Sequence, residues 1–136
     1  MTAMASLGLL IIRVVVGLTF AAHGTQKLFG WFGGHGLQGT GGFFESIGIK
    51  PGRTMALMAG MSELVAGLLL ALGLLTPIAA LLFVVTMLVA MVKVHFPNGY
   101  WATSNGYEYN LLLIVVAVGI ALIGAGSYSL DSILFS

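Results

Sequence analysis

Long apolar runs with very few charges constrain this chain more than any other feature of its sequence. Four such runs can be marked out, at residues 7–29, 54–75, 78–96 and 108–124. A helix needs about 20 mostly apolar residues to cross a membrane, and each run is close to that length. The chain is 59% hydrophobic and only 7% charged, against roughly 25% charged in soluble domains. We therefore predict an all-α, polytopic membrane protein, with a four-transmembrane-helix bundle as the single domain 1–136.

The connections between the runs predict how the bundle is arranged. The first, 30–53, is rich in glycine and suits a loop that folds back on the membrane after the first helix. Within it, Phe43, Phe44 and Ile47 can form one face of a short interfacial helix that ends at Gly48. Four spans place both termini at one end and the two long connections at the other. The count of Lys and Arg then predicts that the long connections face the cytoplasm.

Composition excludes several classes of function. A net charge of +1 leaves no basic surface for nucleic acid. The absence of cysteine excludes disulfides, a cysteine-held iron–sulfur cluster and a dithiol relay within this chain. The sequence also lacks the P-loop, HExxH and GxSxG motifs, and the spacing of His23 and His95 is not diagnostic of haem ligands. We predict no metal site and no covalently bound cofactor.

Glu63 is the charged residue that most needs an explanation. It lies nine residues past Thr54, about 13 Å into its helix, where a charge costs roughly 2.5 to 3.5 kcal/mol unless it is paired or hydrated. The same helix face carries only small residues: Ala56, Ala59, Gly60, Ala66 and Gly67. Two interpretations are open, a structural carboxylate paired with a cation and a carboxylate that binds a ligand or handles protons. As its partner we predict Arg13, in a buried pair between the first two helices.

The first helix carries its polar residues on one face. Arg13 and Lys27 fall within a narrow arc, and His23 lies at the edge of that arc, one turn from Lys27. For His23, a hydrogen-bonded interfacial residue and a proton shuttle or ligand contact are both open interpretations. The position of Arg13 inside the apolar run favours a retained helix over a cleaved signal peptide.

The third and fourth helices place further polar residues near the long connections. Lys93 and His95 are about 200° apart on a regular helix, so we expect Lys93 to face the bundle and His95 the membrane interface. Glu108 opens the fourth helix, where the helix dipole alone can account for a carboxylate. Tyr109 follows it and adds hydrogen-bonding capacity.

We expect these side chains to converge in one half of the bundle. The expected group comes from all four helices and consists of His23, Lys27, Glu63, Lys93, Glu108 and Tyr109. Within it, Glu63 and His23 are the candidate catalytic or proton-handling groups. The candidate ligand-binding groups are Arg13, Lys27, Lys93, Glu108 and Tyr109.

Short motifs along nearly the whole chain carry a family resemblance. They are Arg13 with Gly17, the run His23-Gly24-Thr25-Gln26-Lys27-Leu28-Phe29-Gly30, Phe43-Phe44 before Ile47-Gly48, Glu63 with Gly67 and Gly73, Gly106 with Glu108-Tyr109, and Gly124-Ala125-Gly126 with Ser129-Leu130-Asp131. In their order and spacing the chain resembles the DoxX family of small four-helix membrane proteins, related to the DoxD subunit of thiosulfate:quinone oxidoreductase. Ala125 stands where the family often has Pro.

The resemblance implies a multi-pass protein of the inner (plasma) membrane linked to redox, sulfur or oxidative-stress metabolism. A chain without cysteine then suits a subunit that binds a quinone or a small oxyanion beside a partner redox subunit, or as a homo-oligomer. Whether it would be an enzyme by itself stays open. Two other classes are also open: a small-solute or proton-coupled transporter, and a structural or assembly subunit without activity of its own.

Overall fold

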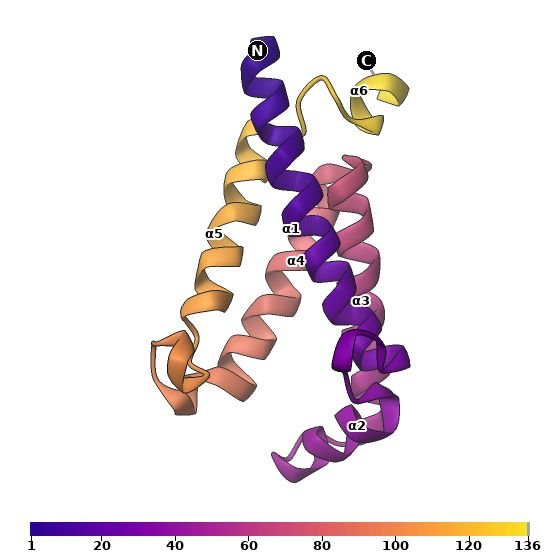
Figure 1. Cartoon of the computed structure of the whole chain (residues 1–136), viewed down its shortest axis with the longest axis vertical. Helices are drawn as coiled ribbons and strands as arrows, with labels where there is room; N and C mark the ends of the chain where they lie inside the picture. Colours follow the sequence, from indigo (N-terminus) through magenta and orange to yellow (C-terminus); the bar gives the residue numbers. More distant parts are fainter. Residues whose placement is uncertain (136) are drawn as a thin grey trace.

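The computed structural model describes residues 1–135, and within them every regular element is a helix (Figure 1). In chain order the elements are α1 (Ala3–Phe29), η1 (Trp31–Gly33), α2 (Gly36–Ser46), α3 (Gly52–Leu72), α4 (Thr76–Ala90), η2 (Met91–His95), η3 (Phe96–Asn98), η4 (Ala102–Ser104), α5 (Glu108–Ile123) and α6 (Leu130–Phe135). Here η2 is a π-helical turn and the other η elements are 3₁₀ turns. The predicted all-α class is confirmed.

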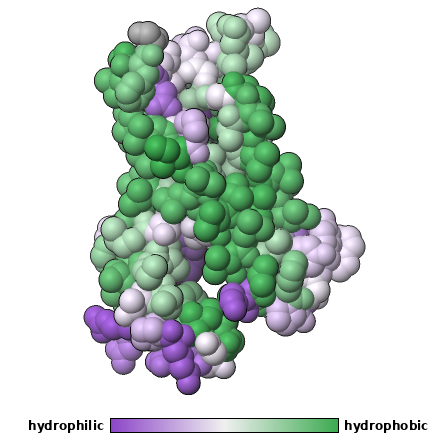
Figure 2. Space-filling model, turned by 180° about the vertical axis from the view of Figure 1, so that it is seen from behind, coloured by the Kyte–Doolittle hydropathy of each residue, from purple (hydrophilic) through white to green (hydrophobic). Residues whose placement is uncertain are grey.

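In the described part of the chain, three helices are long and apolar enough to cross a membrane. They are α1, α3 and the continuous segment Thr76–Asn98 that begins with α4, whereas α5 is apolar but has only 16 residues. A wide hydrophobic band crosses the middle of the molecule, and hydrophilic residues gather mainly at the end of the long connections (Figure 2). Exposure of so large an apolar surface to water would be unfavourable, so the chain is a multi-pass membrane protein.

The helices run up and down as predicted. Both termini lie at one end, and the connections 30–51 and 91–107 lie at the other (Figure 1). The first connection folds back and contains α2, an 11-residue helix that is longer than the predicted interfacial turn. The end of the second span differs from the prediction of residue 75, because Gly73 adopts the left-handed conformation (φ 66°) and stops α3 at Leu72.

Glycines bring α1 and α3 into close contact. A Cβ atom on Gly24 would lie 2.6 Å from the carbonyl oxygen of Gly60, and one on Gly17 would lie 2.5 Å from that of Gly67. Only hydrogen fits at such positions, so the two backbones touch as in other small-residue membrane interfaces. The small-residue face predicted around Glu63 is therefore the α1 contact surface of α3.

Arg13 does not pair with Glu63, so the predicted buried pair between them is wrong. Its guanidinium lies at the termini end and, within residues 1–135, donates only to backbone carbonyl oxygens, those of Leu70 (3.2 Å), Ala71 (3.3 Å), Tyr128 (2.9 Å) and Ala125. These carbonyls belong to the end of α3 and to the C-terminal tail. Because guanidinium has five donors in a planar fork, one side chain can hold these separate segments together.

The C-terminal tail also closes the α3–α4 turn. Asp131 of α6 accepts hydrogen bonds from the backbone N–H groups of Leu75 (2.6 Å) and Thr76 (2.8 Å), at the start of α4. The N-cap residue of α4, Leu75, supplies no capping side chain, so Asp131 takes that role from a distant part of the chain. Burial raises the pKa of Asp131, but the bonds from Thr76 and Leu75 and the charge of Arg13 outweigh it and leave the pKa below its ordinary value.

Candidate functional site

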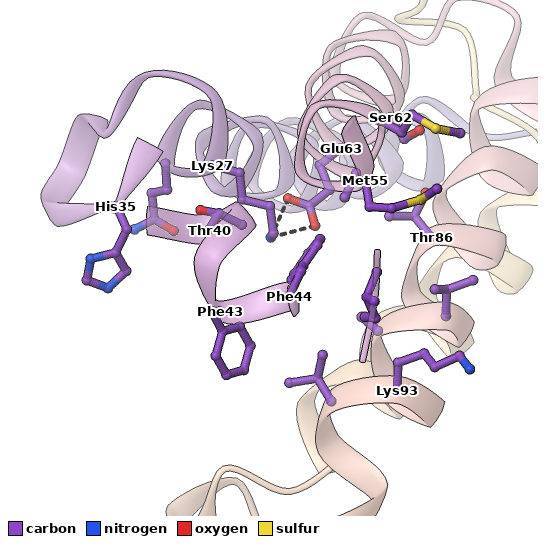
Figure 3. A pocket seen from close by; sticks show the side chains of 18 of the residues that line it. Lys27, His35, Thr40, Phe43, Phe44, Met55, Ser62, Glu63, Thr86 and Lys93 are labelled. Atoms are coloured by element: carbon purple, nitrogen blue, oxygen red, sulfur yellow. Dashed lines mark hydrogen bonds and ion pairs between the residues drawn. The ribbon is translucent and has the colours of Figure 1, made fainter. Parts of the chain in front are cut away.

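A charged pair links α1 and α3 in the half of the bundle near the long connections. The Lys27 Nζ atom lies 2.7 Å from Glu63 Oε1 and 2.9 Å from Oε2, so it donates to both carboxylate oxygens (Figure 3). The Glu63 side chain is 3% exposed and that of Lys27 is 26% exposed. The carboxylate is therefore buried in the bundle, while its partner still reaches the surface.

The helix geometry explains why these two residues meet. The Gly24–Gly60 contact fixes the register of the antiparallel helices, and it leaves Lys27 and Glu63 about six residues, or roughly 9 Å, apart along the axis. Side chains on a helix lean toward its own N-terminus. Lys27 thus leans toward the termini end and Glu63 leans toward the long connections, so that their side chains close the gap from both sides.

The pair lies on the wall of a cavity of about 610 Å³. Its lining comes from α1, the first connection, α2, α3, α4 and η2, and includes Gln26, Lys27, His35, Thr40, Phe43, Phe44, Met55, Met58, Ala59, Ser62, Glu63, Leu82, Val85, Thr86, Val89, Lys93 and His95. Figure 2 shows the surface hollowed between two lobes at this end of the molecule. Most of the wall is apolar, and the Lys27–Glu63 pair forms one polar region within it.

The π-helical turn η2 changes the predicted orientation of Lys93 and His95. We expected only Lys93 to face the bundle, but both residues line the cavity, because the wider turn rotates the residues that follow Ala90. The Lys93 ammonium points away from Lys27 and Glu63 (Figure 3). His95 Nδ1 lies 2.9 Å from the carbonyl oxygen of Asn105 in the second long connection.

The part of the chain that forms this cavity is similar to known proteins. The sequence model of the DoxX family matches residues 8–96, a stretch that contains every cavity-lining residue. The chain belongs to the DoxX family. This DoxX chain is 32% identical over 129 residues to a Bacillus subtilis (strain 168) protein named "Putative oxidoreductase CatD", a match that covers 95% of the chain and 88% of that protein.

Two further relatives of this DoxX chain have no assigned activity. An uncharacterized membrane protein of Mycobacterium tuberculosis is 31% identical to it, over 88% of the chain and 77% of that protein. An uncharacterized protein of Haemophilus influenzae is 32% identical, over 91% of the chain and 88% of that protein. No solved structure matches the chain.

The structure of this DoxX protein separates the predicted convergent group. Lys27, Glu63 and Lys93 share the cavity, whereas His23, Glu108 and Tyr109 lie outside its lining. The rings of His23 on α1 and Tyr109 on α5 lie near each other, with centroids 6.2 Å apart and planes tilted by 48°. The Glu108 carboxylate accepts a hydrogen bond from the Ala102 backbone N–H (3.0 Å), which ties down the second long connection.

Several cavity residues were not predicted from the sequence. They are the aromatic and methionine side chains Phe43, Phe44, Met55 and Met58, together with Ser62 and Thr86. Phe43 and Phe44 were expected on an interfacial helix and not in a cavity. One signal was available for Ser62, since a hydroxyl beside Glu63 in an apolar helix indicates a polar surface.

Proposed function

We propose that this DoxX protein binds the headgroup of a quinone in the cavity beside Lys27 and Glu63, as a subunit of a membrane redox system. The observation that supports the proposal is a buried carboxylate paired with a lysine on the wall of a mainly apolar cavity of about 610 Å³. Ligand sites commonly combine apolar walls with a few convergent polar groups, at volumes of roughly 300 to 1,000 Å³. A flat quinone ring with carbonyl oxygens matches both the apolar wall and the charged pair.

The arrangement of charge favours a neutral ligand over an oxyanion. An oxyanion needs a cation that is free to pair with it, but Lys27 already donates to both oxygens of Glu63. Lys93, the other lysine of the lining, directs its ammonium away from the pair (Figure 3). A bound anion would also lie against the Glu63 carboxylate. A quinone carbonyl carries no net charge and avoids this repulsion.

The pair has a hydrogen-bond donor to offer. An ammonium group has three N–H donors, and Glu63 takes two of those of Lys27. The third can donate to a quinone carbonyl oxygen. Reduction of a quinone takes up electrons together with protons, and a carboxylate–ammonium pair beside the headgroup can relay those protons. The electrons would come from a partner redox subunit, which accords with a relative named as an oxidoreductase.

We further propose that α5 is a fourth span and that the protein lies in the inner (plasma) membrane. At 1.5 Å per residue its 16 residues extend about 24 Å, somewhat less than the roughly 30 Å hydrocarbon core. No Asp, Glu, Lys or Arg occurs between Glu108 and Asp131, so the uncharged stretch continues beyond the helix. A short span is accommodated by local thinning of the bilayer.

Direct ligand binding tests the proposed function. The purified full chain in lipid nanodiscs is titrated with a tailless benzoquinone and, separately, with thiosulfate. The same titrations are run on Lys27→Ala and on Lys50→Ala, a matched control because Lys50 is an exposed lysine outside the cavity. We expect the quinone to bind and Lys27→Ala alone to weaken it by about tenfold, the effect of one lost hydrogen bond to a charged donor.

Other results would point to other functions. Binding of thiosulfate but not of the quinone would assign the cavity to an oxyanion. Uptake of a solute by sealed liposomes without a redox partner would favour a transporter. If neither ligand binds the unmodified protein, or if Lys27→Ala binds the quinone as well as the unmodified chain, the quinone proposal is wrong and a structural subunit takes its place.

A further inference from the structure

Three cavity-lining residues of α3 and α4 are also on the outer surface of the bundle. Met58 on α3 is 58% exposed, and Val85 and Val89 on α4 are 49% and 55% exposed, yet all three line the cavity. A side chain can do both only at an opening. These residues lie within membrane-spanning segments, so the opening between α3 and α4 faces lipid.

The fold explains why α3 and α4 part at this place. At the termini end the two helices are joined by the short turn 73–75, and Asp131 holds the start of α4 against it. From there the helices diverge toward the long connections (Figure 1). The opening is therefore a groove, closed at the turn and continuous with the cavity that holds the Lys27–Glu63 pair.

We propose that this groove holds the linear apolar tail of the ligand whose headgroup lies at Lys27 and Glu63, and that the ligand enters sideways from the bilayer. The inference rests on the proposed function and adds to it that the ligand is an amphiphile with a long hydrocarbon tail. On α3 the lining runs from Met55 to Glu63, about 12 Å of helix. That length is apolar except for Ser62 and Glu63, so a tail contacts apolar residues and a headgroup contacts the polar ones.

Occupancy of the groove has a specific energetic signature. A hydrocarbon tail in a bilayer is already out of water, so moving it into the protein gains no hydrophobic free energy. The tail therefore gains little from the groove itself and must simply fit into it. Narrowing the groove should discriminate between ligands with and without a tail, because only the former need the space.

The experiment compares two ligands and four chains. The ligands are a tailless dimethoxy-methyl-benzoquinone and the same ring with a decyl tail, each titrated against the full chain in nanodiscs of one lipid composition. The chains are the unmodified protein, Val89→Trp on α4, Met58→Trp on α3, and Val115→Trp. Val115 is a matched control because it is 60% exposed on α5 and outside the cavity lining.

We expect Val89→Trp and Met58→Trp each to lower the affinity ratio of tailed to tailless quinone by about tenfold, because the added ring overpacks the groove. Val115→Trp should leave the ratio as in the unmodified chain. If neither groove substitution alters the affinity ratio, the inference about the tail is wrong, while the proposed headgroup site still stands. If the tailless quinone displaces bound phospholipid, and the two quinones bind with equal affinity, the groove is a site for lipid acyl chains instead. If neither quinone binds the unmodified chain, the proposed function fails together with the inference.

Discussion

Removal of either member of the Lys27–Glu63 pair should destabilise the fold, and by unequal amounts. The informative substitutions are Lys27→Met and Glu63→Met, since methionine keeps an unbranched side chain of similar length and removes the charge. Lys27→Met leaves the Glu63 carboxylate, which is 3% exposed, without a partner. Glu63→Met leaves the Lys27 ammonium, whose side chain is 26% exposed and can extend to water or the headgroup region.

The magnitudes follow from these environments. An uncompensated buried charge typically costs about 3 to 5 kcal/mol of stability, so we expect Lys27→Met to lower the free energy of unfolding by that amount. For Glu63→Met we expect about 1 to 3 kcal/mol, because the ammonium can be rehydrated and chiefly hydrogen bonds are lost. The double variant replaces the pair with two apolar side chains, a change that is often close to neutral. It should therefore be more stable than Lys27→Met alone.

The free energy of unfolding is measured by titrating the protein in mixed micelles with sodium dodecyl sulfate and following helicity. Lys50→Met, which alters an exposed lysine away from the cavity, controls for the loss of a positive charge. Two results would refute the reasoning. One is additive effects of the single substitutions, which would show that the side chains do not interact. The other is a larger cost for Glu63→Met than for Lys27→Met.

Three further predictions concern the rest of the fold, each read from the same unfolding titration. Gly24→Ala should cost about 1 to 3 kcal/mol, whereas Gly8→Ala, with nothing within 4 Å of the added Cβ, should cost nothing; equal effects would contradict the close α1–α3 contact. Arg13→Lys should cost about 1 to 3 kcal/mol although the charge remains, because lysine cannot reach the separate carbonyls; an unchanged midpoint would show that charge alone matters. The pKa of Asp131 is lowered on folding, so its contribution is present above the unfolded pKa of about 3.9 and is lost as pH falls through the folded value. Asp131→Asn should thus be less stable than the unmodified chain near neutral pH, and the gap should narrow below about pH 4; a gap that is constant with pH would contradict the capping role.

The fold could be predicted from the sequence to the extent that hydrophobic length and glycine content determine it. The apolar runs, the common end of the termini and the fold-back of the first connection all follow from the cost of exposing backbone or charge in a bilayer. The exact helix ends do not follow. The end of α3 depends on the left-handed Gly73, and the start of α4 depends on Asp131, a partner more than fifty residues away. No local pattern contains that information.

The sequence predicted the types of residue in the candidate site, but it did not predict the partner of Glu63. Helical periodicity placed Glu63 and Lys27 on inward faces, but the partner predicted for Glu63 was Arg13, whereas the structure pairs it with Lys27. The choice depends on the helix register, and the side chain of Arg13 leans toward the termini end, away from Glu63. The π-helical turn η2 was also beyond a calculation based on a regular helix, which is why His95 was placed outside the cavity.

The glycine contacts determine the geometry of the charged pair, since the Gly24–Gly60 contact lies one helical turn from Lys27 and from Glu63. A shift of α1 along α3 by one turn would move the two charges about 5.4 Å relative to each other. A hydrogen bond of 2.7 Å cannot survive that displacement. The backbone contact thus holds the carboxylate and the ammonium in reach of each other, and with them the polar region of the cavity. A substitution that separates α1 from α3 should therefore disturb ligand binding as well as stability, even though no atom of Gly24 lines the cavity.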